Sequence, residues 1–286
     1  MTNVINIFPS RAQVGEGPVW HKETGSVYWV DIVAGEVHQT SLDSKVTKTF
    51  TIAESVGAVA PRETGGLVAA VASGFMGFDA EGGETHHRKI LAPGLRMNDA
   101  KTDPRGVYWS GSCELDFEPG RGGLWRMDKD WEPSLVLEGL TLPNGLGWSP
   151  DGHTFYLVDS LERVVRKYGY DPGSSQMDTQ SEVLMGPEMF PGLPDGLAVD
   201  TRGHLWIAEF SASALHEFSP EGILLQTISM PTSQPTSCAF VGDGLDQLWV
   251  TSAALGVDPA KDPDAGAIFE VQGHGAVGMP VAKFRG

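Results

Sequence analysis

Four short segments of the chain place an oxygen-bearing side chain among glycines, prolines or polar residues. The segments are 15–18, 96–99, 142–145 and 193–196, and they carry Glu16, Asn98, Asn144 and Asp195. Carboxylate and amide oxygens are hard donors that suit Ca²⁺, Mg²⁺ or Mn²⁺ better than a metal that prefers thiolates. These residue types therefore indicate a hard-cation site, provided that the fold brings the segments together.

The elements that must position these residues are the copies of an internal repeat. An apolar triplet recurs at intervals of roughly 40 to 50 residues, which is the spacing of four-stranded propeller blades. The triplets begin at Val27, Leu67, Val107, Phe155, Leu205 and Leu248. The equivalent positions upstream of the triplets hold Glu16, Gly57, Asn98, Asn144, Asp195 and Ser237. Four of these six positions carry strong hydrogen-bonding or ligating groups, so they predict a metal site on a central axis.

The segments between these positions predict short strands rather than helices. Turn tetrads such as 103–106, 149–152 and 200–203 combine Asp or Ser with Gly, and the first two also contain Pro; these residues favour tight turns. Runs rich in β-branched and aromatic residues separate them. We therefore expect an all-β fold, a single six-bladed β-propeller over residues 1–286. Residues 3–8 are expected to supply the outer strand of the last blade.

Two side chains in the third repeat are expected to point towards a ligand above the metal. Arg96 and Asn98 are two residues apart, so an extended strand presents both on one face. Arginine donates hydrogen bonds, and asparagine both donates and accepts them. The same alternation predicts that Asp99 points the other way and supports the turn.

The loop after the third repeat contains several acids whose role the residues leave open. Glu114, Asp116 and Glu118 lie between two expected strands. One of these carboxylates could reach over the site and bind hydroxyl groups. A solvated acidic loop is the alternative for each of them.

The net charge argues against some classes of partner, and the cysteine content indicates the cellular compartment. The 286-residue chain has a formal net charge of −17, which argues against nucleic acid and anionic membranes as partners. It has no apolar run long enough to span a bilayer and no basic start followed by an apolar core. Cys113 and Cys238 are expected to be reduced thiols, and we expect a cytoplasmic protein. A nucleophile elbow and a phosphate-binding glycine loop are both absent from the sequence.

Several motifs together resemble one known family. They are GEGPVW at 15–20, YWVDI at 28–32, VGAVAP at 56–61, RMNDAKTDP at 96–104, LPNGLGWSPDG at 142–152, PDGLAVD at 194–200 and PTSCAF at 235–240. In combination they resemble the SMP-30/gluconolactonase/regucalcin-like (LRE) family over nearly the whole chain. One departure is Ala100, where the family usually has glycine after the Asn-Asp pair.

The resemblance implies a six-bladed propeller with a single divalent cation. The family's metal ligands correspond to Glu16, Asn144 and Asp195, and its proposed catalytic base corresponds to Asp195. Substrate-contacting residues correspond to Arg96 and Asn98, with Asp116 near the position of a sugar-contacting acid. Ca²⁺ is the favoured cation, and Zn²⁺, Mn²⁺, Mg²⁺ and Fe²⁺ remain open.

The resulting expectation is a metal-dependent hydrolase that opens a sugar (aldono-) lactone ring to the aldonic acid. A small, neutral, hydroxyl-rich substrate fits an acidic protein with one local cation. Two alternatives stay open: hydrolysis of another ester or of a phosphotriester at the same metal, and a non-catalytic calcium-binding propeller. The sequence leaves the sugar, the physiological metal and the oligomeric state undetermined.

Overall fold

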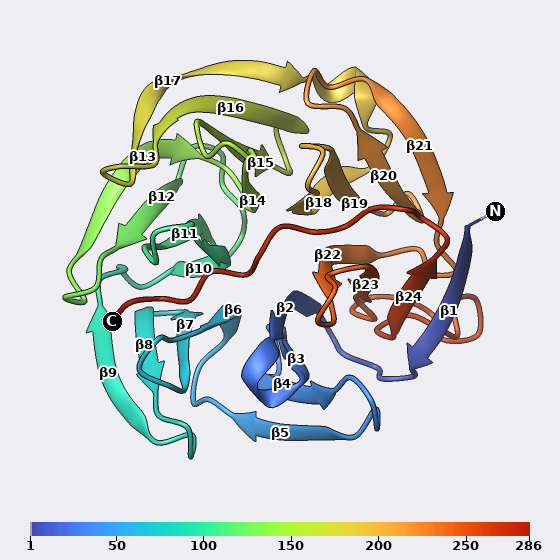
Figure 1. Cartoon of the computed structure of the whole chain (residues 1–286), viewed down its shortest axis with the longest axis horizontal. Helices are drawn as coiled ribbons and strands as arrows, with labels where there is room; N and C mark the ends of the chain where they lie inside the picture. The colour runs from blue at the N-terminus through green and yellow to red at the C-terminus, as the bar shows by residue number, and fades with distance from the viewer. Residues whose placement is uncertain (1) are drawn as a thin grey trace.

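The computed structural model describes residues 2–286 and consists of six four-stranded antiparallel sheets around a central axis (Figure 1). In each sheet one edge strand lies at the axis and the other forms the outer rim. The expected all-β, six-bladed propeller is therefore confirmed. Within residues 2–286 there is no helix of the length and apolar character that crossing a membrane requires.

The first three blades follow one another along the chain, each running from the axis outwards. Blade 1 contains β2 (Gly15–His21), β3 (Ser26–Asp31), β4 (Glu36–Ser41) and β5 (Thr47–Thr51), with the 3-10 turn η1 (Lys22–Thr24). Blade 2 contains β6 (Val56–Pro61), β7 (Leu67–Val71), β8 (Gly74–Phe78) and β9 (Glu84–Lys89). Blade 3 contains β10 (Leu95–Thr102), β11 (Tyr108–Glu114), β12 (Gly122–Met127) and β13 (Pro133–Leu140).

The second half of the ring repeats this order. Blade 4 contains β14 (Pro143–Trp148), β15 (Thr154–Asp159), β16 (Val164–Asp171) and β17 (Gln176–Met185), followed by the 3-10 turn η2 (Pro187–Met189). Blade 5 contains β18 (Leu193–Val199), β19 (Leu205–Phe210), β20 (Ala214–Phe218) and β21 (Leu224–Ser229). Blade 6 contains β22 (Pro235–Val241), β23 (Gln247–Ser252), β24 (Ile268–Gln272) and β1 (Asn3–Phe8).

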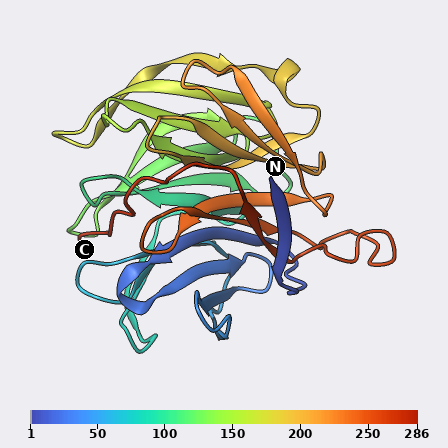
Figure 2. The ribbon, with the colours of Figure 1, turned by 45° about the vertical axis from the view of Figure 1, so that its right-hand side comes forward.

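The ring closes because the N-terminal strand joins the last blade. β1 pairs antiparallel with β24, from Asn3 opposite Gln272 to Phe8 opposite Ile268. Figure 2 shows this dark blue strand beside the red strands of blade 6. The expected role of residues 3–8 is confirmed. The closure joins the N-terminal strand and β24 in one sheet, so the ring cannot open without breaking that ladder.

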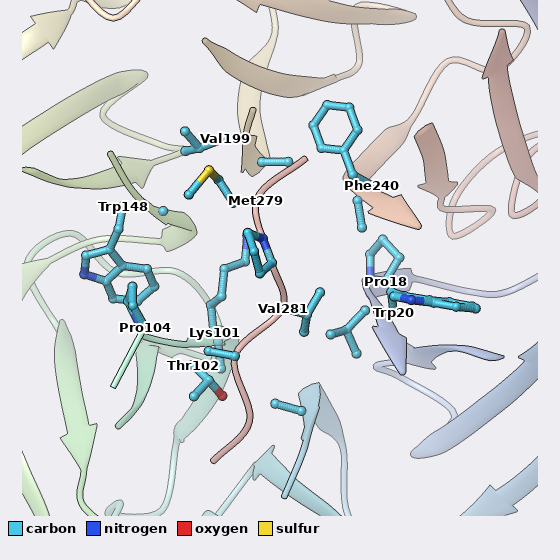
Figure 3. A pocket seen from close by; sticks show the side chains of 18 of the residues that line it. Pro18, Trp20, Lys101, Thr102, Pro104, Trp148, Val199, Phe240, Met279 and Val281 are labelled. Atoms are coloured by element: carbon cyan, nitrogen blue, oxygen red, sulfur yellow. The ribbon is translucent and has the colours of Figure 1, made fainter. Parts of the chain in front are cut away.

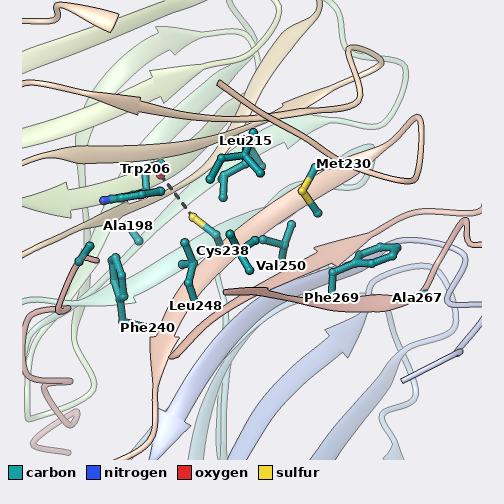
Figure 4. Packing of buried hydrophobic residues seen from close by; sticks show 14 residues of the cluster. Ala198, Trp206, Leu215, Met230, Cys238, Phe240, Leu248, Val250, Ala267 and Phe269 are labelled. Carbon is teal, nitrogen blue, oxygen red and sulfur yellow. Dashed lines mark hydrogen bonds between the residues drawn. The ribbon is translucent and has the colours of Figure 1, made fainter. Parts of the chain in front are cut away.

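The hydrophobic core is a ring of six clusters, one between each pair of neighbouring blades. In the cluster between blades 5 and 6, Trp206 of β19 packs with Cys238 and Phe240 of β22 (Figure 4). The Cys238 thiol donates to the Trp206 carbonyl, 3.3 Å away. Cys113 and Cys238 are both free and buried, in agreement with the expected reduced thiols. Burial raises the pKa of the Cys238 thiol to about 12, so it stays protonated.

A segment that the repeat does not predict crosses one face of the propeller. After β24 the chain runs over the central opening towards the C-terminus (Figure 1). Near its end, Phe284 is fully buried against Tyr108 and Trp131. The Phe284 amide donates to the Pro61 carbonyl at 2.8 Å, which fastens the tail to blade 2.

A local irregularity recurs in every innermost strand. The ladder with the second strand of the blade loses register once in each blade, at Glu16/Val19, Val56/Ala58, Met97/Ala100, Pro143/Leu146, Pro194/Leu197 and Pro235/Cys238. A bulge leaves residues without a ladder partner and re-aims their side chains. The six equivalent positions identified in the repeat lie at or inside these breaks, which is how a flat strand presents polar groups to the axis.

Candidate active site

Four polar side chains sit at these breaks, each from a different blade. Glu16, Asn98, Asn144 and Asp195 come from β2, β10, β14 and β18, and all are buried, with between 3% and 8% of their surface exposed. Buried polar groups are normally satisfied by hydrogen bonds or bound ions. Their surroundings therefore indicate what they are built to hold.

The two asparagines are linked directly. Asn98 Nδ2 donates to Asn144 Oδ1 at 2.9 Å and to the Pro143 carbonyl at 3.0 Å. Asn144 Nδ2 donates to Ser160 Oγ at 2.9 Å. This network orients the Asn144 amide with its oxygen on the Asn98 side. A carbonyl oxygen has two lone pairs, so Asn144 Oδ1 retains one for a further partner.

Arg96 and Asn98 meet as the strand alternation predicts. The Arg96 guanidinium donates to Asn98 Oδ1 at 2.6 Å and to the Met97 carbonyl at 3.1 Å. It also lies 5.9 Å from the ring centre of Phe117, in the loop between β11 and β12. Sequence reasoning missed Phe117. Its backbone adopts a φ of 58°, which is rare for a bulky residue, and no sequence signal marks it.

Burial raises the pKa of the acids near the axis, and neighbouring acids add to this effect at Glu16 and Asp195. Burial raises the pKa of Glu16 well above its usual value, and the charges of Asp195 and Asp99 add to the effect. Burial likewise raises the pKa of Asp195, with a further contribution from Asp99, while Arg96 and a hydrogen bond from Asn144 oppose it. Like charges in a buried space disfavour ionisation unless a cation compensates them.

Asp99 is buried near the axial carboxyl groups and lines an axial cavity whose lining includes none of Glu16, Asn98, Asn144 and Asp195. Its Oδ1 accepts from the Ala100 amide at 2.7 Å, within the break between Met97 and Ala100. The expectation that Asp99 points away from the ligand and supports the turn stays a prediction. Lys101 follows on the same strand, and its Nζ donates to the Leu197 carbonyl at 2.6 Å. Burial lowers the pKa of Lys101, and Asp99 is the main charge that opposes this effect.

The donor set fits a divalent cation. Glu16 and Asp195 are hard carboxylate donors, and Asn144 offers a neutral oxygen. Asp195 Oδ1 is buried and accepts no hydrogen bond. A buried acceptor without a partner costs free energy, so this atom is an available ligand position. Two buried carboxyl groups, an oriented amide and an unpartnered oxygen match the chemistry of a small oxygen-ligated metal site.

Among the residues that the structure describes, no hydrogen bond or ion pair joins the acids of this loop to the cluster. Asp116 is exposed between β11 and β12, and its backbone N–H donates to Glu114 Oε2 at 2.6 Å. The loop nevertheless begins at the same end of the blade as Arg96, since Leu95 pairs with Glu114. A substrate-binding role for Asp116, or for Glu114 or Glu118, stays a prediction.

The other end of the axis has a different character. A cavity of about 490 Å³ lies among the second halves of the inner strands and is lined mainly by apolar residues. Figure 3 shows Trp20, Trp148 and Phe240 around it, with Met279 and Val281 of the C-terminal segment crossing it. This apolar, covered end is poorly suited to a hydroxyl-rich molecule. The polar cluster lies at the beginnings of the same strands.

A second group of potential metal ligands lies at the far end of β18. Asp200, His204 and Glu217 have ligand atoms within 4.8 Å of one another, the one such group of three His, Cys, Asp or Glu residues in the part of the chain that the structure describes. Arg202 already pairs with Asp200 Oδ2 at 2.6 Å and Glu217 Oε1 at 2.8 Å. We therefore interpret this group as an ion-pair network whose cation is the guanidinium. The Asp200 tetrad was predicted only as a turn.

Comparison with known proteins gives a consistent match over most of the chain. Residues 14–254 match the family model described as the SMP-30/gluconolactonase/LRE-like region. Regucalcin from Danio rerio is 33% identical over 98% of this chain and 97% of its own length. A pentonolactonase from Haloferax volcanii is 32% identical over 97% of this chain and 96% of its own.

Solved structures agree with the architecture. A luciferin-regenerating enzyme superposes with a TM-score of 0.91 at 29% identity and covers 100% of both chains. A calcium-binding protein, regucalcin, from Agrobacterium tumefaciens gives a TM-score of 0.93 at 26% identity, covering 97% of this chain and 95% of its own.

Proposed function

Because the chain belongs to the SMP-30/gluconolactonase/LRE-like family, we propose that it is a lactonase that opens a sugar lactone ring with the aid of a divalent cation. The ligands would be Glu16, Asn144 and Asp195. One observation carries the proposal: two buried carboxyl groups and an oriented amide converge on the axis, and Asp195 Oδ1 has no partner. The pentonolactonase relative supports a lactone as the substrate class.

A bound cation would supply Lewis-acid polarisation of the lactone carbonyl and a lowered pKa for water at the site. Asp195 would orient the attacking water and accept the water proton. The oxygen of water would add to the carbonyl carbon, and the ring C–O bond would break. The proton would pass to the departing ring oxygen, which gives the open-chain hydroxy acid.

Substrate orientation would fall to the groups above the triad. Arg96 donates through a guanidinium held by Asn98 and Phe117, so its geometry is established before substrate arrives. Asn98 would accept from or donate to ring hydroxyl groups. Asp116, on the loop at the same end of the blade, would add a hydroxyl contact. The substrate we propose is a small neutral aldonolactone, and Ca²⁺ is the favoured metal.

The test is an assay of the hydrolysis of five- and six-carbon aldonolactones, in which a pH indicator monitors the release of acid. Protein stripped with a chelator should be inactive, and one of Ca²⁺, Zn²⁺, Mn²⁺, Mg²⁺ or Fe²⁺ should restore turnover. Aryl esters and phosphotriesters belong in the same panel. Turnover of those substrates alone would replace the lactone in the proposal with another ester class.

The specific alternative is a calcium-binding protein without turnover, which the regucalcin from Agrobacterium tumefaciens suggests by its description. Under this alternative the same residues would bind Ca²⁺, and no lactone or ester would be hydrolysed. Calcium titration beside the activity panel separates the two functions.

A further inference from the structure

Three blades share an acid at one position of the ladder between the first and second strands. The residue that precedes each proposed ligand, Glu16, Asn144 or Asp195, pairs with an acidic residue. These pairs are Gly15 with Asp31, Pro143 with Asp159 and Pro194 with Glu209. At the corresponding level, the second strands of the other blades carry Val71, Ser112 and Ser252. The acids therefore occur in the blades that carry the proposed metal ligands.

Each of these acids holds the backbone just ahead of the inner strand. Asp159 accepts from the Thr141 amide at 2.8 Å and from the Leu142 amide at 3.0 Å. Asn144 follows two residues later. The Asp159 side chain is buried, with 2% of the residue exposed.

The other two acids make the same kind of contact. Asp31 accepts from the amides of Gln13, at 2.6 Å, and Val14, at 3.1 Å. Glu209 accepts from the Gly192 amide at 2.5 Å, and its other oxygen lies 2.6 Å from His216 Nε2. We call Asp31, Asp159 and Glu209 the clasp acids.

The hydrogen bonds to the clasp acids restrain the backbone next to the bulges, where strand pairing is lost. In β14 the regular ladder stops after Pro143 and resumes at Leu146, so Asn144 has no strand pairing of its own. Hydrogen bonds from two successive backbone amides to a buried carboxylate restrain the segment where the ladder does not. Charge-assisted bonds of this type are shorter and stronger than those between neutral groups.

We propose that the clasp acids are positioning residues for the metal triad: they hold the entry segments that present Glu16, Asn144 and Asp195 to the cation. This inference rests on the proposed function, because it requires a cation at the triad. It assigns the acids no contact with the metal or the substrate. Outer partners of metal sites typically change affinity by about 10- to 100-fold when they are replaced.

The variant that tests this is Asp159→Asn. It keeps the shape of the side chain but turns one oxygen into an NH₂ group that faces a backbone N–H. The matched control is Asp262→Asn. Asp262 is also buried and accepts from the Ser233 amide at 2.6 Å, ahead of β22, whose axial position is Ser237. Both variants lose an acceptor ahead of an inner strand, and only one of those strands carries a proposed ligand.

Calorimetric titration of chelator-treated protein with Ca²⁺, and separately with Mn²⁺, measures the Kd for the cation. Thermal unfolding of the metal-free variants measures Tm. We expect Asp159→Asn to raise the Kd about tenfold or more, and Asp262→Asn to leave it within about twofold, although both lower Tm. Saturating cation should restore most of the activity of Asp159→Asn. Asp159→Glu should retain more affinity than Asp159→Asn, since Glu209 shows that a longer acid serves in this place.

Equal Ca²⁺ and Mn²⁺ affinity in the wild type and Asp159→Asn, or equal weakening by Asp262→Asn, would overturn the clasp while leaving the proposed function intact. A wild-type protein that binds no divalent cation would overturn both. If Asp159→Asn does not fold, Glu209→Gln carries the same test, because Glu209 clasps the segment ahead of Asp195.

Discussion

The Asn98 amide donates to Asn144 Oδ1 across the boundary between blades 3 and 4, at 2.9 Å. The contact joins the group proposed to bind substrate to a group proposed to bind metal. Because Arg96 in turn donates to Asn98 Oδ1 at 2.6 Å, the three side chains form one chain of hydrogen bonds. A change at any member should therefore be felt by the others.

Removal of the central member should affect both kinds of binding. Asn98→Ala leaves Asn144 Oδ1 without its donor and Arg96 without its acceptor. We expect the Kd for the cation and the KM for the lactone each to rise about 3- to 10-fold, the cost of a neutral hydrogen bond. Calcium titration and steady-state kinetics measure the two constants. A change in KM alone would separate the substrate contact from the metal site.

The proposed base predicts a loss of turnover. Asp195→Asn retains an oxygen donor for the cation but removes the carboxylate that accepts the water proton. We expect kcat to fall below detection in the lactone assay while the variant still binds some metal, as calorimetry would show. Near-normal turnover would rule out Asp195 as the base and leave it as a ligand only.

Phe117 should support Arg96, the arginine proposed to bind substrate. Phe117→Ala removes the ring that lies 5.9 Å from the Arg96 guanidinium. An exposed cation–π contact contributes about 0.5–1 kcal/mol, so KM should rise about two- to fivefold with little change in kcat. Leu115→Ala is the control, since Leu115 is 55% exposed in the same loop. The two variants should differ in KM; identical kinetics would mean that the ring does not hold Arg96.

His38 should make stability fall in acid. Burial lowers the pKa of His38 from 6.5 to about 4, although Asp31 opposes this and Glu36 Oε2 lies 3.5 Å from its ring. The ring stacks on Trp29 with 3.9 Å between centroids. As the pH falls below 6.5, the unfolded chain takes up a proton on His38 before the folded chain does. The contribution of the neutral, buried His38 to the free energy of unfolding is therefore complete above pH 6.5 and is lost as the pH falls towards 4.

The check is urea unfolding at several pH values between 4.5 and 7.5 for the wild type, His38→Gln and His153→Gln, His153 being exposed. His38→Gln should show a shallower fall in the free energy of unfolding below pH 6.5. His153→Gln should follow the wild type. Parallel curves for all three proteins would mean that another group governs the acid limb.

The C-terminal tail should contribute to global stability through one side chain. Phe284 is fully buried against Tyr108 and Trp131. Phe284→Ala should lower the free energy of unfolding by about 3–5 kcal/mol, the range for a large buried aromatic residue. Urea unfolding measures this, with Val281→Ala as the control at 36% exposure. A loss below about 0.5 kcal/mol, the range of surface substitutions, would show that the tail is dispensable.

Features that depend on local pattern can be predicted from the order of the residues. Turn residues and strand-forming runs repeat along the chain, so the number of blades and the innermost strands follow from their spacing. The same spacing singled out Glu16, Asn98, Asn144 and Asp195. Alternation along an extended strand was enough to place Arg96 beside Asn98, because Arg96 precedes the break in β10 and Asn98 lies at its start.

Features that depend on pairing between distant segments emerge only in the folded ring. The break in β10 between Met97 and Ala100, where the ladder with β11 loses register, is one such feature. The clasp of Asp159 on Thr141 and the docking of Phe284 between Tyr108 and Trp131 join residues that have no shared local pattern. Such contacts are selected by packing and by the need to satisfy buried amides, and those demands exist only once the ring has closed.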